Sequence, residues 1–320
     1  HRDLHSFPTR RSSDLDNSLV PLAAFLRSLT ARDPSRLGSL LGPADPRGEP
    51  ELRQAIARTL SSQGFSAGPD DVLVTGSSQQ ALALCALAFA KRGRAVLVES
   101  PSYDKPVELF AASGLEPRAL PCDREGPLPE AFAREASGGE AAFAYLMPNF
   151  RNPSASTMGL ARRRAIVAAA AAAGLLIVED DYVGALRYGG RAYPSLWTLA
   201  GSGGVVSTGT FSKLLSPGLR VGYLVARGGA LESLARFQAL AGMGASRIFQ
   251  RGLVSFIGAG SYRSHIRRAC RLYAARRDAL ATALAAFFPE FRFETPMGGL
   301  FLWGRLDAVE IGRASCRERV

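Results

Sequence analysis

Residues 208–223 read TGTFSKLLSPGLRVGY, and this stretch decides how the rest of the chain is interpreted. It places Lys213 in a loop after small hydroxyl residues, with Arg220 seven positions further on. The chain has 39 basic residues, of which only Lys91, Lys105 and Lys213 are lysines. An arginine guanidinium stays protonated and cannot form a Schiff base, so amine chemistry through a lysine has three candidates. Only Lys213 lies in such a loop. The alternative is a solvated surface lysine between two strands.

Outward from this loop, short apolar runs alternate with longer helical patterns from Asp71 to Val225. The alternation predicts an α/β fold with a mostly parallel sheet flanked by helices, whose ligand lies at the carboxyl ends of the strands. Leu175–Glu179 has no polar alternation, which predicts a strand buried on both faces. After Gly229 the pattern is helical, with one long helix and then a strand pair. The predicted strands are 72–75, 95–99, 117–120, 142–146, 175–179, 205–208 and 220–225, with the strand pair at 291–306; the predicted helices are 16–30, 51–60, 79–91, 104–112, 160–173 and 261–288.

Five polar loops follow predicted strands: Thr75–Gln80, Glu99–Tyr103, Pro148–Pro153, Glu179–Tyr182 and the Lys213 loop. Small residues in the first loop leave backbone N–H groups free at a helix N-terminus, which favours phosphate. Tyr103 suits stacking on a planar ligand or ordinary core packing. Asn152 suits donation to a ligand oxygen or an Asx turn before proline. The carboxylates at 179–181 need a partner, and a helix cap or a surface pair is the alternative.

Together these loops indicate one kind of ligand. It is anionic at one end, flat in the middle, basic at a ring nitrogen and reactive toward an amine. Pyridoxal 5′-phosphate has all four properties and is the predicted cofactor. No metal site is predicted.

The motifs GTFSKLLSPGLRVGY, VEDDY and PNFRNPS resemble the class I/II aminotransferases with the type I pyridoxal-phosphate fold. The resemblance is to the branch that holds 2-aminoadipate-type and aromatic aminotransferases and MocR-type regulators, and it covers nearly all of residues 16–309. It implies a large domain with a mostly parallel sheet and a smaller α+β domain, here truncated. It also implies a homodimer with the site at the subunit interface.

The resemblance implies a role for each polar residue in these loops. Lys213 would form the Schiff base and move the proton between substrate and cofactor. Asp180 would pair with the ring nitrogen and keep it protonated, while Tyr182 would bond the ring hydroxyl oxygen, which makes these three the catalytic candidates. The other implied cofactor contacts are Asn152 to the same ring oxygen, Tyr103 stacked on the ring, and a phosphate-binding set of Ser77, Ser78, Gln79, Thr210, Ser212 and Arg220.

The chain departs from the family pattern at Pro43, where the family usually carries a tyrosine that reaches the phosphate of the neighbouring subunit. Its two ends are also unusual. Residues 5–15 and 310–320 can be encoded by opposite strands of one DNA stretch that resembles a sequencing adapter. We therefore expect residues 1–15 and 310–320 to be adapter-derived, 16–45 to be an N-terminal segment, 46–258 a large cofactor-binding domain, and 259–309 the start of a truncated small domain. In the family the arginine that binds the substrate carboxylate would lie beyond Val309, so this fragment is expected to transaminate poorly.

Composition bounds the remaining possibilities. The formal charge is +11, and removing the +1 carried by each suspect end leaves +9, nearly all from dispersed arginines. Such a distribution indicates solubility or anionic ligands and not a specific nucleic-acid groove. Cys85, Cys122 and Cys270 are scattered, which predicts neither a disulfide framework nor a zinc site. His265 is the only histidine between the two ends, so histidine triads are excluded. No apolar run is long enough to span a bilayer, and a cytoplasmic location is expected.

Three functions remain open. The first is an aminotransferase that moves an amino group from an amino acid to a 2-oxo acid. The second is the cofactor- or effector-binding domain of a MocR-type regulator of the GntR family, which would bind DNA if a winged helix precedes this domain. The third is a doubly wound domain that binds another phosphorylated ligand. The same pocket residues serve the first two functions, and PNFRNPS favours the enzyme.

Overall fold

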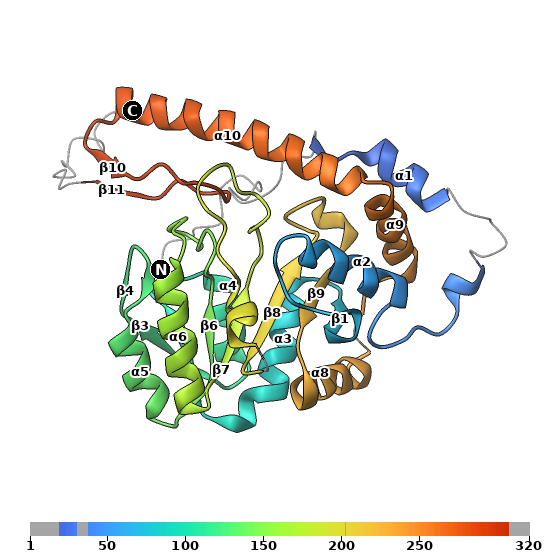
Figure 1. Cartoon of the computed structure of the whole chain (residues 1–320), viewed down its shortest axis with the longest axis horizontal. Coiled ribbons are helices and arrows are strands. Elements are labelled where there is room, and N and C mark those ends of the chain that lie inside the picture. Colours follow the sequence, from blue (N-terminus) through green and yellow to red (C-terminus); the bar gives the residue numbers. More distant parts are fainter. Residues whose placement is uncertain (1–18, 31–37, 202, 243, 307–320) are drawn as a thin grey trace, which may run out of the picture.

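A seven-stranded sheet forms the centre of the computed structural model (Figure 1), which describes residues 19–30, 38–201, 203–242 and 244–306. The predicted adapter-derived ends, 1–15 and 310–320, lie outside the described residues. In spatial order the strands are β1 (Val72–Thr75), β9 (Gly222–Val225), β8 (Val205–Thr210), β7 (Leu176–Asp180), β6 (Ala141–Leu146), β2 (Ala95–Glu99) and β3 (Glu116–Leu120).

Strands β8, β7, β6, β2 and β3 are mutually parallel, whereas β9 runs antiparallel to both of its neighbours. The prediction of a mostly parallel α/β sheet is therefore confirmed. The exception arises because β8 and β9 are joined by a short turn that holds only the 3-10 helix η6 (Pro217–Leu219), too short for the crossover that parallel neighbours need. All residues of β7 are buried, as its uninterrupted apolar run predicts.

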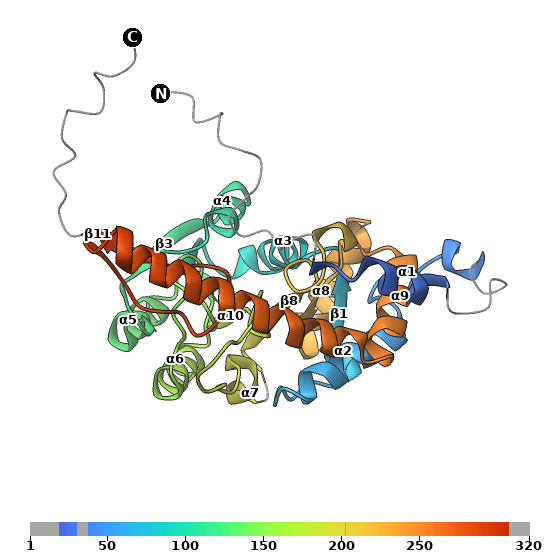
Figure 2. The ribbon, with the colours of Figure 1, turned by 90° about the horizontal axis from the view of Figure 1, so that it is seen from above.

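Helices cover both faces of the sheet. Figure 2 shows α3 and α4 on one side and α5, α6 and α7 on the other. The α-helices between residues 50 and 240 are α2 (Pro50–Ser61), α3 (Ser78–Phe89), α4 (Asp104–Ala112), α5 (Pro129–Ser137), α6 (Leu160–Ala173), α7 (Leu196–Ala200) and α8 (Gly228–Leu240). The shorter elements are η3 (Gly38–Leu41), η4 (Pro69–Asp71), η5 (Ala90–Arg92) and the hairpin β4 (Cys122–Asp123) with β5 (Gly126–Pro127).

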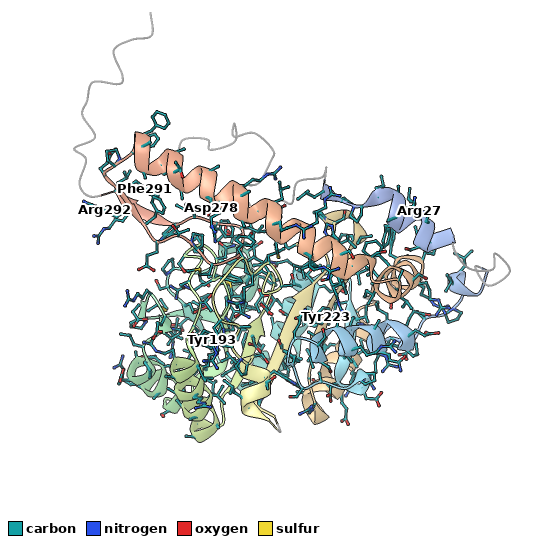
Figure 3. All side chains as sticks on the ribbon, turned by 45° about the horizontal axis from the view of Figure 1, so that its top comes forward. Arg27, Tyr193, Tyr223, Asp278, Phe291 and Arg292 are labelled. Atoms are coloured by element: carbon teal, nitrogen blue, oxygen red, sulfur yellow. The ribbon has the colours of Figure 1, made fainter. Side chains whose placement is uncertain are left out.

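A long helix, α10 (Ser261–Phe287), crosses one edge of this layered structure (Figure 1). It starts beside α9 (Arg247–Gly258), which packs on α1 (Leu22–Thr30), and it ends at the hairpin β10 (Phe291–Phe293) with β11 (Gly304–Leu306). Figure 3 shows Phe291 and Arg292 at one end of the molecule and Arg27 of α1 at the other. The long helix and the strand pair were both predicted from the sequence.

Some boundaries of helices and strands differ from the predicted ones and others agree, for identifiable reasons. The strand predicted at 220–225 begins at Gly222 because Arg220 adopts a left-handed backbone, with φ of 49°. Helix α6 ends at Ala173 as predicted, because Gly174 takes the left-handed C-cap with φ of 62°. The helix predicted at 16–30 is found at Leu22–Thr30, and residues 16–18 lie outside the described part of the chain.

Within the described residues, the structure contains no helix long and apolar enough to cross a membrane. The same residues contain no cluster of three or more histidine, cysteine, aspartate or glutamate side chains suited to a metal ion.

Candidate active site

The turn between β1 and α3 forms one end of the candidate site. Ser77 caps α3, and its Oγ accepts the backbone N–H of Gln80 at 3.1 Å. From the turn that precedes β9, Nη2 of Arg220 donates to the same Oγ at 3.4 Å. This approach requires Gly222, because a Cβ there would lie 2.7 Å from the carbonyl carbon of Ser77 and 2.8 Å from the nitrogen of Ser78. Helix N-terminus, hydroxyl and guanidinium therefore meet at one point, which suits a phosphate.

The lysine turn follows β8, which pairs with β9 on the side away from β1. Oγ1 of Thr210, the last residue of β8, accepts the backbone N–H of Ser212 at 3.0 Å. The Ser212 hydroxyl is buried, and no residue of the described chain bonds to it. Lys213 follows it and is half-buried. A buried hydroxyl without a partner costs free energy, so Ser212 is suited to bond a group that is not part of the protein.

Asp180 is the buried carboxylate of the site, at the carboxyl end of β7. Its Oδ2 accepts the Tyr145 hydroxyl at 2.8 Å and its Oδ1 accepts the Thr208 hydroxyl at 3.1 Å. Burial raises the pKa of the Asp180 carboxyl to about 6, while the two hydrogen bonds act in the opposite direction. A carboxylate with two lone-pair sites still open and only neutral donors nearby is suited to bind a protonated ring nitrogen.

Two further loops border Asp180. The Tyr182 hydroxyl donates to the carbonyl oxygen of Phe150 at 2.9 Å, which ties the Glu179–Tyr182 loop to the loop that carries Asn152. Asn152 precedes a cis proline and is half-buried. Tyr103 begins α4 as its N-cap residue and is also half-buried. Burial raises the pKa of the Tyr182 phenol, so this group keeps the proton that it donates to Phe150.

Glu179, which precedes Asp180 in the sequence, binds the N-terminus of a helix. Both carboxylate oxygens of Glu179 accept backbone N–H groups of α7, from Leu196 at 2.9 Å and from Trp197 at 3.1 Å. The helix-cap alternative raised for this run therefore applies to Glu179. Burial raises the pKa of the Glu179 carboxyl to about 7.

A buried ion pair behind the site was not predicted from the sequence. Nη1 of Arg151 lies 3.5 Å from Oε1 of Glu99, and both side chains are almost completely buried. Glu99 also accepts the backbone N–H of Met147 at 2.7 Å. The pair joins the end of β2 to the loop that carries Asn152. Burial raises the pKa of Glu99 to about 7, although Arg151 opposes this rise.

Arg163 was also missed, and it is completely buried on α6. Its guanidinium donates to the carbonyl oxygens of Met158 at 2.8 Å, Pro148 at 2.8 Å and Pro194 at 3.1 Å, and to Oδ1 of Asn149 at 2.7 Å. The Asn149 amide in turn donates to Oδ1 of Asp181 at 3.1 Å. Arg163 therefore holds Pro148 and Asn149, the first residues of the loop that carries Asn152, in place.

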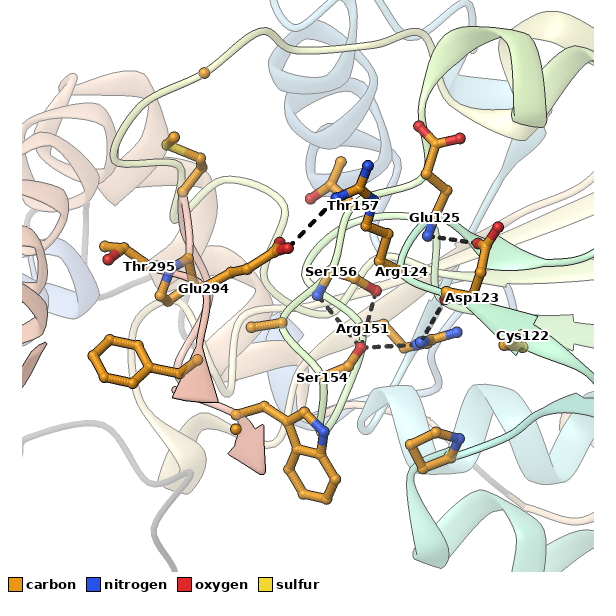
Figure 4. Close-up of a pocket in the computed structure, with 18 of the residues that line it drawn as sticks. Cys122, Asp123, Arg124, Glu125, Arg151, Ser154, Ser156, Thr157, Glu294 and Thr295 are labelled. Carbon is orange, nitrogen blue, oxygen red and sulfur yellow. Dashed lines mark hydrogen bonds and ion pairs between the residues drawn. The ribbon is translucent and has the colours of Figure 1, made fainter. Parts of the chain in front are cut away.

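A cavity of about 920 Å³ lies beside the candidate site, and none of the predicted site residues lines it. Figure 4 shows Arg151, Ser154 and Ser156 linked by hydrogen bonds on one wall, and Arg124 facing Glu294 across the cavity. Residues 122–125 and 151–157 form one side, and the segment around β10 forms the other.

The structure thus brings the predicted residues to the carboxyl ends of β1, β2, β6, β7 and β8. Hydrogen bonds join Ser77 to Arg220 and Thr210 to Ser212, and the backbones of Ser78 and Gly222 approach closely. Gln79 lies in the first turn of α3 and is half-buried. Pro43 lies in an exposed loop, where its carbonyl oxygen accepts Nη1 of Arg247 at 3.0 Å.

Comparison with known proteins places this arrangement in a family. A model of the aminotransferase class I and II family matches residues 29–319. The chain belongs to this family, and the resemblance inferred from the sequence is confirmed.

Curated relatives include both enzymes and regulators. The 2-aminoadipate transaminase of Thermus thermophilus is 34% identical over 256 residues, which cover 79% of this chain and 64% of that protein. The uncharacterized HTH-type transcriptional regulator YisV of Bacillus subtilis is 30% identical over 295 residues, which cover 91% of this chain and 60% of that protein. The chain therefore spans less than two thirds of the length of these relatives.

Among solved structures, an α-aminoadipate aminotransferase from Thermus thermophilus, LysN, superimposes with a TM-score of 0.84 at 31% identity, covering 92% of this chain and 75% of that one. That structure holds N-(5′-phosphopyridoxyl)-L-leucine. Family and neighbour together imply pyridoxal phosphate as the cofactor. The residues here fit it, because Ser212 offers a buried hydroxyl without a partner and Asp180 a buried carboxylate.

Proposed function

We propose that the protein is an aminotransferase that moves an amino group from an amino acid to a 2-oxo acid, with Lys213 as the cofactor lysine. One observation carries the proposal. The lysine turn, the buried Asp180 carboxylate and the contact between Ser77 and Arg220 lie at the same end of four neighbouring strands, β1, β9, β8 and β7. The family membership and the transaminase relatives support the same reading.

Bound pyridoxal phosphate would supply an aldehyde for an amine and a ring that withdraws electrons from the substrate Cα. The chain would supply the rest. Arg220, Ser77 and Ser212 would hold the phosphate, and Tyr103 would cover the ring. Asp180 would hold a proton on the ring nitrogen as its charged partner. Lys213 Nζ would take the proton from the substrate Cα and return it, acting as general base and acid. Tyr182 and Asn152 would bond the ring hydroxyl oxygen.

We also propose that residues 46–258 form the cofactor-binding domain, that 259–309 begin a smaller domain, that the protein is a cytoplasmic homodimer, and that its substrates are an amino acid and a 2-oxo acid. A second function has its own support, since several relatives are HTH-type regulators and one is the probable rhizopine catabolism regulatory protein MocR of Rhizobium meliloti, 31% identical over 231 residues. In that case the same pocket would sense the cofactor, and DNA would be bound by a separate winged helix.

The test is borohydride reduction in the presence of pyridoxal phosphate, followed by peptide mass spectrometry. Label is expected on Lys213 and lost in Lys213→Ala. The matched control is Lys105→Ala, because Lys105 forms a surface ion pair with Glu108 at 2.8 Å and should keep full labelling of Lys213. Label at another lysine, or none, contradicts the proposal. Turnover with amino acids by the full-length protein would favour the enzyme, and it should fall by about 10²–10⁴-fold in Lys213→Ala of that protein. Labelling without turnover in the full-length protein would favour the regulator.

A further inference from the structure

Helix α10 touches the lysine turn with its first turns only. Its buried residues are Tyr262, His265 and Ala269, all near its N-terminal end. Every residue of α10 beyond Ala269 is at least partly exposed. The helix is therefore most deeply buried at the end that lies by the lysine turn. Further along, Arg277 donates to the carbonyl oxygen of Pro296 at 2.8 Å, and the helix ends near the β10–β11 hairpin (Figure 1).

Two contacts of α10 lie on either side of Lys213. The His265 ring nitrogen Nε2 lies 2.9 Å from the carbonyl oxygen of Leu214, the residue that follows Lys213. A carbonyl can only accept, so Nε2 carries the proton and donates. The Tyr262 ring packs edge-on against Phe211, two residues before Lys213, with centroids 5.6 Å apart. Tyr262 and His265 are three residues apart in sequence, which places them on one face of the helix.

The sheet supports the turn from the opposite side. The Phe211 ring also packs against Tyr223 of β9, with centroids 5.9 Å apart. Tyr223 in turn lies against Gly209 of β8, where a Cβ would come within 2.3 Å of the ring. The lysine turn is thus held between the sheet and the first turns of α10.

We propose that His265 is a positioning residue for Lys213. Its hydrogen bond to Leu214 ties the lysine turn to α10, so that the placement of the Lys213 amine depends on the orientation of that helix. The inference rests on the proposed function, in which Lys213 is the cofactor lysine.

The test compares three single variants of the full chain. His265→Leu removes the donor and keeps an apolar side chain, while His265→Gln keeps an N–H at the position of Nε2. Cys270→Ala is the matched control, because Cys270 lies on the same helix but its thiol donates to Ala185 at 3.5 Å, away from the lysine turn. Hydrogen–deuterium exchange of the 211–216 peptide is measured first, without cofactor. The dissociation constant for pyridoxal phosphate and the pH midpoint of its bound absorption band are measured next.

In His265→Leu we expect faster exchange of the 211–216 peptide, a dissociation constant raised by about tenfold, as for loss of one buried hydrogen bond, and a shifted absorption midpoint. His265→Gln and Cys270→Ala should stay within about twofold of the parent, since the bond is kept in both. Parent-like exchange and absorption in His265→Leu would overturn the proposal, as would a His265→Gln protein that behaves like His265→Leu.

A substitute variant and a cofactor-free measurement cover the two ways in which the experiment could fail. If His265→Leu does not fold, His265→Asn replaces it, since its shorter amide does not reach the Leu214 carbonyl. If the parent protein binds no pyridoxal phosphate, the proposed function fails, yet peptide exchange still reports whether His265 holds the turn.

Discussion

The Tyr145 hydroxyl donates a 2.8 Å hydrogen bond to Oδ2 of Asp180, across the neighbouring strands β6 and β7. Tyr145 lies outside the five loops that follow the strands and faces the carboxylate from within the sheet. Its bond lowers the pKa of Asp180, against the larger effect of burial. Burial also raises the pKa of the Tyr145 phenol, so the donor keeps its proton.

Removing this donor should raise the pKa of Asp180 above about 6. Hydrogen bonds to charged groups contribute about 1.5–3 kcal/mol, which corresponds to about one to two pKa units. Tyr145→Phe is the variant, and the Asp180 carboxyl is followed by ¹³C NMR in the cofactor-free protein. Thr208→Val, which removes the second donor at 3.1 Å, should act in the same direction. An unchanged pKa in both variants would contradict this account of the carboxylate.

Neutralising Asp180 should flatten the pH dependence of stability. The folded-state pKa of about 6 exceeds the usual value of 3.8, so the folded protein holds this proton more tightly than the unfolded chain. The resulting stability is present at low pH and lost as pH rises through about 6. A shift of about two units amounts to about 3 kcal/mol. Relative to the parent, cofactor-free Asp180→Asn should therefore gain up to about 3 kcal/mol between pH 4 and pH 8. Urea unfolding at both pH values measures it, and parallel profiles would sink the prediction.

Breaking the Glu99–Arg151 pair should destabilise the protein in a pH-dependent way. Removing one partner of a buried ion pair typically costs about 3–5 kcal/mol. In Arg151→Met the cost should be larger at pH 8 than at pH 5, because Glu99, with its pKa of about 7, is protonated at the lower pH and needs no cation. Part of the loss should return in Glu99→Gln/Arg151→Met. Arg118→Met serves as control, since its ion pairs with Glu116 and Glu140 are exposed and their loss should change stability little at either pH. Equal losses at both pH values would contradict the assignment.

Filling the space at Gly222 should weaken anion binding. A methyl group there meets the backbone of Ser77 at 2.7 Å, so the turn before α3 must move away from Arg220. We expect Gly222→Ala to bind pyridoxal phosphate at least about tenfold more weakly, as expected when about 1.4 kcal/mol of binding is lost. Gly229→Ala is the matched control, because nothing lies within 4 Å of its added carbon and it is in the first turn of α8. Fluorescence titration measures both, and equal affinities would show that the close approach is unimportant.

The sheet and its polar loops could be predicted because each strand is a short apolar run and each loop begins where that run ends. The direction of β9 could not, since an apolar pattern is the same read either way. The loops themselves did not indicate Tyr145 as a partner of Asp180, because that contact depends on β6 and β7 being neighbours.

The burial of Arg163 could not be predicted for a different reason. Three successive arginines, 162–164, indicate a solvated face of α6, yet Arg163 is completely buried. It shares a helical stripe with the buried residues Ile166 and Ala170, three and seven positions on. That spacing indicates a buried position, whereas the charge of the three arginines indicates an exposed one.

The position of β9 between β1 and β8 also bears on how the protein is made. Ser77 leaves the ribosome 143 residues before Arg220, its partner in the candidate phosphate site. Until β9 has emerged, the edge strand β1 lacks the strand that joins it to β8. The nascent chain therefore holds an unfinished sheet edge from the synthesis of β1 until β9 has emerged, and the contact between Ser77 and Arg220 cannot form before then.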